Sequence, residues 1–424
     1  AMNNDMALNG TEAGGDVDVI SASSTQWVFD MTQAQKDAAP VYEGEMLLKE
    51  HGVGSWTARA IGHRWNSRNE LLGVAAEKSA TAASWLGTEE YPIDAFNTAW
   101  KRVIGHQFHD DITATSIASE YERSWNDYML SLNQFGNEYE NAVGGVASAM
   151  DTSVAEGTAL VVNNPVAIDR NDVVEATVTM DSDCEYVRVY DDDGNEVPSQ
   201  ILSKDGNVFE IAFTAEVASM GYRVFDVRPA DSASDIDTGM SVTANSLSND
   251  KYDVTIDENG DISSIYDKTL DKELLAEPIR LGQLNDTETE WPAWELKFSD
   301  YADKDAREYV ADKASDIEIV ENGPARVALK ITREYGNSSY EQIVSLDNGG
   351  EAVEVQNVID WHEKSTMLKA TFQLNAANET ATYDLGLGAI ERTNNTQWQA
   401  ESPAQKWADL TDESGEFGVS ILSD

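Results

Sequence analysis

Hydrophobic residues recur with two different periods along the 424-residue chain. Between about residue 58 and residue 140, apolar positions are three or four residues apart, which is typical of helices that bury one face. After Gly144-Gly145, apolar and polar residues alternate, which is typical of strands. The change of period predicts a helical part followed by a strand part.

The helical part contains three candidate helices. The first covers about residues 58–87 and ends before the break at Tyr91-Pro92, and the second covers about residues 94–109. The stretch MTQAQKDAAP predicts a shorter helix that ends before Pro40. The apolar face of the second helix is formed by Phe96, Trp100, Val103, Ile104 and Phe108.

The third helix is the clearest, because its apolar residues form a single stripe over about six turns. Thr115 or Ser116 is expected to cap this helix. Three helices with one apolar face each indicate a small bundle. The stripe consists of Ile117, Tyr121, Trp125, Tyr128, Leu132, Phe135 and Tyr139.

The strand part consists of short alternating stretches separated by DG, NG and GG turns. The residues DDDGN at 191–195 predict a hairpin turn rather than a calcium loop, and ENGD at 258–261 predicts a type I′ hairpin. About 270 residues of short strands without an intervening helix indicate stacked β-sandwiches. The expected fold class is therefore α+β and multidomain. The clearest stretches are DVVEATVTM, EYVRVY, VFEIAF, YRVFDV, YDVTI, DIEIVE, ARVALKITREY and EAVEVQNVIDW.

Changes of composition predict four segments. Residues 1–40 resemble the edge of a larger domain, 41–150 hold the helices, and 151–240 and 241–424 form two β-domains. The composition shift in ADSASDIDTGMS marks the last boundary. The chain opens without a signal-peptide pattern and stops inside the strand-like stretch EFGVSILSD. We therefore expect a piece of a longer protein, truncated at both ends.

The chain is strongly acidic, with 77 Asp and Glu against 29 Lys and Arg and a net charge of −48. Such a surface repels nucleic-acid phosphates and anionic membranes, so neither is an expected partner. No run of about 18 apolar residues predicts a membrane span. A single cysteine, Cys184, excludes an internal disulfide and a metal site built only of thiolates.

The stretch HQFHDDITAT at residues 106–115 contains several side chains that could bind a metal ion or act in catalysis. His106 and His109 are three residues apart, a spacing that places both on roughly one helix face and can supply half of a zinc site. Asp110 and Asp111 follow at a predicted helix C-terminus, where negative charge opposes the helix dipole. Such local conflicts are found at functional sites. A polar helix end without a ligand stays open as the alternative.

Several stretches together resemble glycoside hydrolase family 38, the zinc-dependent α-mannosidases. AWKRVIGHQFHDDITATSI resembles the family signature, and the resemblance extends from about residue 40 to the end. It implies a middle three-helix domain and C-terminal β-domains of the galactose mutarotase-like super-sandwich type. The further matching stretches are YEGEMLLKEHGVGSWTARAIGHRWNSRNELL, VVNNPVAIDRNDVVEATV, VIDWHEKSTMLKATFQL, GLGAIER and ESPAQKWADLTDESGEFGVSILSD.

The resemblance also implies roles for individual residues. His109 matches the zinc ligand that the middle domain supplies, and Asp110 matches an aspartate that contacts sugar hydroxyls. His106 and Asp111 are then supporting residues. Ala114 stands where the family usually has Gly, which supplies unusual backbone angles that Ala tolerates at a cost of about 1 kcal/mol. We therefore expect a slightly altered turn and not the loss of the site.

His51 and Trp56 lie in the segment that enters the bundle, where the family lines part of its pocket. For both residues, two roles are possible alternatives: a contact with substrate, or packing at a domain junction. The remaining zinc ligands of the family, a His-x-Asp pair and the nucleophilic aspartate, belong to an N-terminal α/β-barrel. No His-x-Asp precedes the bundle in this chain, because its first histidine is His51. The nucleophile and the acid/base are therefore assigned to no residue.

We therefore expect part of a zinc-dependent retaining α-mannosidase that acts on α-mannoside oligosaccharides or glycoconjugates. This chain alone is expected to be inactive and to bind zinc weakly. The alternatives are a mannosylglycerate-type hydrolase of the same family, a non-catalytic carbohydrate-binding β-sandwich protein, and a structural β-protein with a surface His–Asp pair. A bacterial cytoplasmic location is expected, with secretion and assembly into a homo-oligomer left open.

Overall fold

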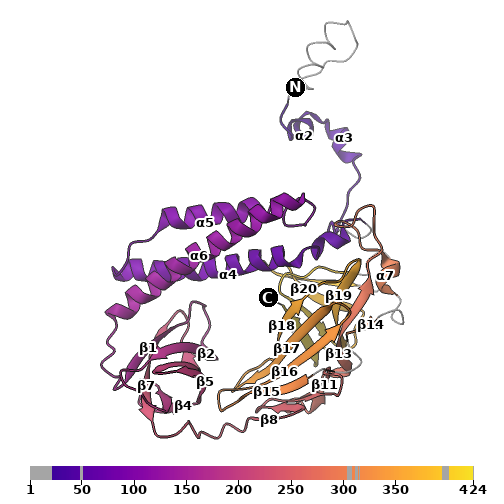
Figure 1. Cartoon of the computed structure of the whole chain (residues 1–424). Coiled ribbons are helices and arrows are strands. Elements are labelled where there is room, and N and C mark those ends of the chain that lie inside the picture. Colours follow the sequence, from indigo (N-terminus) through magenta and orange to yellow (C-terminus); the bar gives the residue numbers. More distant parts are fainter. Residues whose placement is uncertain are drawn as a thin grey trace. The chain divides into compact units, whose positions relative to one another are not determined.

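The computed structural model describes residues 22–47, 51–302, 308–310, 314, 316–393 and 401–423 (Figure 1). The chain divides into two units, residues 1–48 and residues 49–424. In the first unit, the described helices are α2 (Gln26–Asp30) and α3 (Gln33–Asp37). The predicted short helix is confirmed as α3, which begins with a capping box in which the Thr32 side chain accepts the backbone N–H of Gln35.

In the second unit, the described part begins with helices and continues as strands. The helices are the 3₁₀ helix η1 (Val53–Trp56), α4 (Ala60–Leu86), α5 (Ile93–His106), α6 (Ala118–Ala149) and α7 (Phe298–Ala302). The strands up to residue 256 are β1 (Thr158–Asn163), β2 (Arg170–Thr179), β3 (Tyr186–Tyr190), β4 (Glu196–Val197), β5 (Ser199–Asp205), β6 (Val208–Val217), β7 (Tyr222–Ala230), β8 (Ser241–Thr243), β9 (Ser246–Ser248) and β10 (Tyr252–Ile256). The later strands are β11 (Ile262–Asp267), β12 (Lys272–Glu273), β13 (Leu275–Asn285), β14 (Glu308–Tyr309), β15 (Asp316–Asn322), β16 (Arg326–Tyr335), β17 (Ser338–Asp347), β18 (Glu354–Asp360), β19 (Thr366–Leu374), β20 (Thr380–Asp384), β21 (Ala389–Thr393), β22 (Trp407–Thr411) and β23 (Gly418–Leu422).

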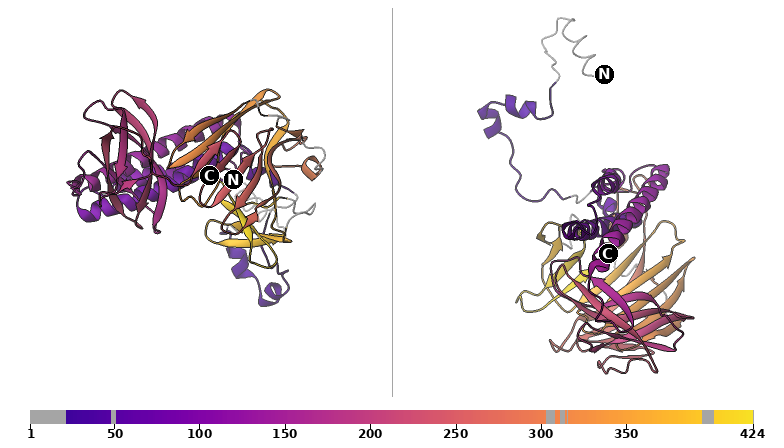
Figure 2. Two further views of the ribbon diagram at one scale, coloured as in Figure 1. Left: turned by 90° about the horizontal axis from the view of Figure 1, so that it is seen from below. Right: turned by 90° about the vertical axis from the view of Figure 1, so that its left-hand side faces the viewer.

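The helices α4, α5 and α6 run alongside one another as the predicted bundle (Figure 1; Figure 2). The buried face of α4 is built mainly of small residues, so its backbone approaches the other two helices closely. Gly73 lies directly against the aromatic rings of Trp100 and Phe135, whose ring centroids are 4.9 Å apart. A Cβ atom at Gly73 would lie 2.6 Å from the Trp100 ring. The bundle core therefore pairs small residues on α4 with aromatic residues on α5 and α6.

On two helices, the predicted apolar face includes residues that the structure leaves exposed. On α6, Tyr121, Tyr128 and Phe135 are buried, but Ile117 is 74% exposed because it precedes the helix as its N-cap, and Trp125 at the edge of the stripe is 36% exposed. On the second helix, Phe96 and Val103 are buried, whereas Ile104 is 61% and Phe108 57% exposed. None of the helices in the described ranges combines the length and apolar character needed to cross a membrane.

Strands β1 to β7 form a small β-sandwich. One sheet has the order β1-β7-β3-β4 and the other β2-β6-β5, and their inner faces share one apolar core. Phe213 on β6 and Phe225 on β7 meet edge to face across this core, with ring centroids 5.1 Å apart. The predicted turn at residues 191–195 is confirmed, because the Asp191 carboxylate accepts the backbone N–H of Asp193 and of Asn195.

The later strands form three further sheets. The largest has the path β14-β13-β11-β10-β9-β8, with β12 and β19 paired beside it, and the others are β15-β16-β17-β18 and β21-β20-β22-β23. Residues of β9 to β13 share a core with residues of β16 and β17, so these two sheets pack as a sandwich. The α+β fold with a helical bundle and stacked β-sandwiches is therefore confirmed.

The hairpin between β10 and β11 is confirmed, but its predicted turn type is wrong. A type I′ turn needs positive φ at both central residues. Only Gly260, at φ 80°, has it in this turn. The Asp257 carboxylate instead accepts the backbone N–H of Asn259 and of Asp261, which favours a wider turn closed by one glycine.

The two sandwiches meet through polar contacts. The Gln200 side chain on β5 accepts the backbone N–H of Arg326 at 2.9 Å and donates to Glu321 at 2.8 Å. Asp347 pairs with Arg326 in the β16–β17 ladder, and its Oδ1 is buried without a hydrogen-bond partner among the described residues. Burial, followed by repulsion from Glu354, raises the pKa of Asp347 to about 6.

Gly73→Ala is expected to lower the free energy of unfolding by about 1–3 kcal/mol, because the added methyl group overpacks the contact with Trp100. Gly62→Ala on the same helix is the matched control. A Cβ there meets no atom within 4 Å, and alanine should stabilise the helix by up to about 1 kcal/mol. Urea unfolding followed by helical circular dichroism measures both, and equal stability of the two variants would contradict the packing.

Asp347→Asn is expected to raise the free energy of unfolding by about 1–2 kcal/mol at about pH 7.5. Because the pKa of about 6 lies above the unfolded value, the folded state binds more protons between about pH 4 and pH 6, and ionisation destabilises it as the pH rises. At about pH 5 the gain should fall to about half. Urea titrations measure the difference, with Asp183→Asn as control at a side chain that is 85% exposed. A gain independent of pH would refute the burial argument.

Candidate functional site

The segment between α5 and α6 is a tight loop, not the helix end that its sequence predicts. The helix α5 ends at His106, three residues earlier than expected. Two successive turns follow, in which the N–H of Asp111 donates to the carbonyl of Phe108 and the N–H of Ala114 to that of Asp111, each at 2.9 Å. The loop therefore has its own hydrogen-bonded structure.

The expected cap of α6 by Thr115 or Ser116 is wrong. The N-cap position is Ile117, without a side-chain cap. Thr115 Oγ1 instead donates to the Asp110 carbonyl at 3.3 Å, and the Ser116 N–H donates to the Tyr121 hydroxyl at 2.8 Å. These groups hold the loop to itself and to α6, so they are not available to the helix terminus.

Ala114 has a left-handed backbone with φ 62° and is buried. This is the conformation expected at a position where glycine is usual. An alanine held there stores about 1 kcal/mol of strain. The surrounding contacts therefore determine the course of the loop against the preference of this residue.

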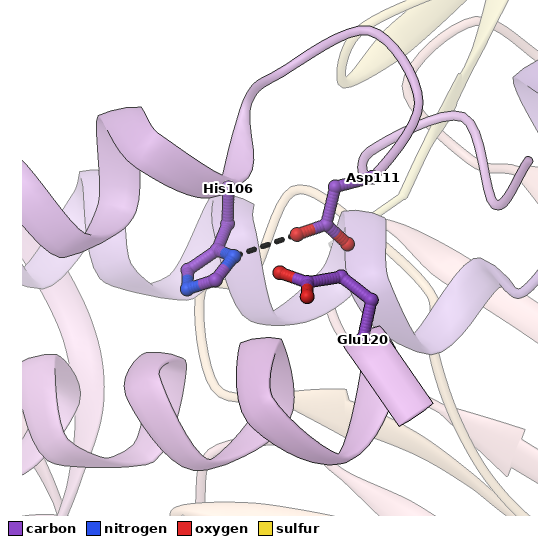
Figure 3. A group of neighbouring side chains, drawn as sticks. All are labelled: His106, Asp111 and Glu120. Carbon is purple, nitrogen blue, oxygen red and sulfur yellow. Dashed lines mark hydrogen bonds and ion pairs between the residues drawn. The ribbon is translucent and has the colours of Figure 1, made fainter. Parts of the chain in front are cut away.

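His106 is buried and bridges three segments (Figure 3). Its Nδ1 lies 2.6 Å from Oδ2 of Asp111 on the loop, and its Nε2 lies 3.0 Å from Oδ2 of Asp127 on α6. The Tyr128 hydroxyl donates to the His106 carbonyl at 3.4 Å, and burial raises the pKa of that phenol, so it stays a donor. One imidazole therefore ties α5, the loop and α6 together.

His109 and Asp110 lie on the outside of the same loop. Their side chains are 76% and 48% exposed, with 3.4 Å between His109 Nε2 and Asp110 Oδ2. The Phe108 ring packs against the His109 ring at 4.3 Å, and the Thr113 hydroxyl donates to the His109 carbonyl. The prediction that His106 and His109 share a helix face is wrong, because the helix ends between them. One imidazole is buried and the other faces outward.

His51 and Trp56 lie where the chain enters the bundle and contacts the β-region. His51 is paired with Glu295, whose carboxylate also accepts the backbone N–H of Gly52 at 3.1 Å. The N–H of Gly54 donates to the carbonyl of Trp294 at 2.9 Å. The His51 side chain remains 75% exposed, and Trp56 is half-buried. These contacts show packing at a junction, and a role of either side chain toward substrate stays a prediction.

A cavity of about 620 Å³ opens between α5, the loop and α6. His106, Asp111 and Glu120 present one ligand atom each into a group within 4.8 Å, an arrangement that could hold a metal ion. His109 and Asp110 do not line this cavity. It is lined by Thr98, Lys101, Arg102, Gly105, His106, Phe108, Asp111, Ser116, Glu120, Arg123 and Asp127.

Glu120 and Asp127 are not among the site residues that the sequence predicts. Both belong to α6, and with Arg123 they follow the spacing of one helix face, which was the available signal. That face reaches His106 only because the loop folds back, and no sequence pattern predicts this fold-back.

One family model matches the later part of the chain. Residues 247–424 match the glycosyl hydrolases family 38 C-terminal domain. Comparison with curated proteins gives no match.

Two solved structures have a similar fold. An α-mannosidase from Enterococcus faecalis V583 is 16% identical and has a TM-score of 0.77, over 99% of this chain and 55% of that one. A protein in glycosyl hydrolase family 38 from Enterococcus faecalis is 16% identical with a TM-score of 0.74, over 96% of this chain and 55% of that one. The chain thus spans about half the length of the structures that it matches. Its residues 247–424 are similar to the C-terminal domain of glycosyl hydrolases family 38, and nearly the whole chain has the fold of these solved proteins.

Proposed function

We propose that this chain is the helical and C-terminal part of a zinc-dependent retaining α-mannosidase, a glycoside hydrolase. The observation that carries the proposal is the outward-facing His109–Asp110 pair on a loop whose course is held by buried contacts. This pair lies in a chain whose fold follows that of an α-mannosidase over 99% of its length.

His109 is suited to be one ligand of a zinc ion. An exposed imidazole offers a nitrogen lone pair, and the Asp110 carboxylate beside it can orient the ring or accept a sugar hydroxyl. Zinc needs three or four such ligands. The others would come from the part of the α-mannosidase that has no counterpart in this chain. Zinc bound there would act as a Lewis acid and as a template for the sugar hydroxyls.

The loop holds His109 in place before any ligand is bound. His106 and Asp111 anchor it on the inner side, and Thr113 and Thr115 bind its carbonyl groups. A binding group held in this way loses little conformational entropy when it binds. The role that the chain's own residues have is therefore to present and orient one ligand and one sugar contact.

Retaining hydrolysis also needs a nucleophile and an acid/base, two carboxyl groups about 5–5.5 Å apart. The proposal assigns neither role to this chain. The catalytic carboxyl groups and the other zinc ligands would then meet His109 only in the intact parent protein.

The chain alone is expected to show no turnover of 4-nitrophenyl α-mannoside, because it contributes one proposed zinc ligand and neither catalytic carboxyl group. The intact parent, assayed with added zinc, is the positive control. Release of nitrophenol by the purified chain at a rate comparable to that of the parent would refute this division of the site.

In the intact parent, His109→Ala is expected to lower kcat/KM at least about 100-fold and to reduce bound zinc, since the metal contributes several kcal/mol to the reaction. The matched control is His362→Ala, which removes another exposed imidazole paired with an aspartate, Asp360, at 3.0 Å. Activity and zinc content by mass spectrometry measure both variants. Full activity in His109→Ala would remove that residue from the site.

A further inference from the structure

One imidazole and three carboxylates from separate segments meet in the cavity between α5 and α6. They are His106, Asp111 on the loop, and Glu120 and Asp127 on α6. We propose that His106, Asp111 and Glu120 form a divalent-cation site, distinct from any zinc at His109 and independent of it. The site would take a cation of the Mn²⁺ or Zn²⁺ class, which accepts imidazole as well as carboxylate.

The orientation of the His106 imidazole suits a residue that binds a metal ion. In metal sites, a ligating histidine usually donates its other ring N–H to a carboxylate. Asp127 occupies that position, 3.0 Å from Nε2. With Nε2 as the donor to Asp127, Nδ1 of His106 can bind a cation once the proton that it shares with Oδ2 of Asp111, 2.6 Å away, is displaced. The ring is 5% exposed, so it cannot turn away to solvent.

The distances between the candidate ligand atoms are close to those found around a bound metal ion. The three candidate atoms lie within 4.8 Å of one another. Ligands bound at about 2.0–2.2 Å lie about 3–4 Å apart, so a cation would draw Glu120 inward and move Nδ1 of His106 and Oδ2 of Asp111, now 2.6 Å apart, slightly away from each other. Glu120 can make this movement, because its side chain is 32% exposed on the first turn of α6 (Figure 3). The cavity leaves room for water on the remaining positions.

The balance of charge also favours a cation. Asp111, Glu120 and Asp127 are 8%, 32% and 22% exposed, and adjacent carboxylates repel each other more strongly where water is excluded. Arg123 compensates them weakly, since it is 70% exposed and lies 3.6 Å from Glu120 and 3.9 Å from Asp127. Arg102 donates instead to Gln134, at 3.0 Å. Lys101 also lines the cavity, and a divalent ion would place further positive charge between the carboxylates themselves.

The alternative occupant of this place is a proton. A hydrogen bond shared by His106 and Asp111 would then link the loop to α5 without any metal. The cation-bound state and the state with a shared proton can be distinguished by experiment, because only binding of a cation requires Glu120.

The test is titration of the chelator-treated chain with MnCl₂, followed by electron paramagnetic resonance, and with ZnCl₂ by calorimetry. One ion is expected to bind per chain, with a directly bound imidazole nitrogen in the Mn²⁺ spectrum. Glu120→Gln should weaken binding by about 10–100-fold or more. His109→Ala should leave binding unchanged, so this result is separate from the test of the proposed function. Glu122→Gln, at an exposed neighbour on the same helix, is the matched control.

Two results would overturn the proposal. One is an affinity weaker than about 1 mM for both metals, and the other is an affinity that Glu120→Gln leaves unchanged. In either case, His106 and Asp111 share a proton and their contact is purely structural. Circular dichroism of each variant checks that the bundle remains folded.

Discussion

The contact of the buried His106 ring with two carboxylates is the interaction on which the site depends. Asp111 and Asp127 lie on opposite sides of the ring, at 2.6 and 3.0 Å from its two nitrogens. A buried polar group is costly unless its partners are present, so this arrangement favours a single course of the loop. The left-handed Ala114 lies between Asp111 and α6, in the part of the loop that leads to Asp127 on the other side of the ring. With Asp111 held inside, the preceding residues His109 and Asp110 face outward.

The bundle in turn is fixed to the β-region at its two ends. Near the end of α4, Ser79 contacts the Asn163 side chain of β1 at 3.3 Å, and Tyr139 of α6 donates to the same side chain at 3.1 Å. At the start of the bundle, Gly54 lies so close to Glu295 that a Cβ atom would be 2.8 Å from its carbonyl oxygen. The β-sheets thus act as the support on which the three helices present the loop.

The sequence predicts the elements well and the loop poorly, for a physical reason. Periods of 3.6 and 2 arise because one face of each element is buried, and the local sequence carries this pattern. The helices and the strands therefore agree with expectation. At the end of α5, the His106 side chain instead contacts Asp127, which is 21 residues away in sequence and meets His106 only after folding. The type of the turn at Gly260 was missed because Asp257 binds the backbone N–H groups of Asn259 and Asp261. Spacing alone paired His106 with His109, and only the family resemblance distinguished them.

We propose that His109, and not His106, supplies a ligand to the zinc of an α-mannosidase site. Anomalous diffraction at the zinc edge from crystals of the intact parent protein tests it most directly. The account predicts a zinc peak at about 2.0–2.1 Å from a ring nitrogen of His109, with Asp110 beside it. Zinc held by other residues with His109 free, or zinc only at the His106 cluster, would contradict it.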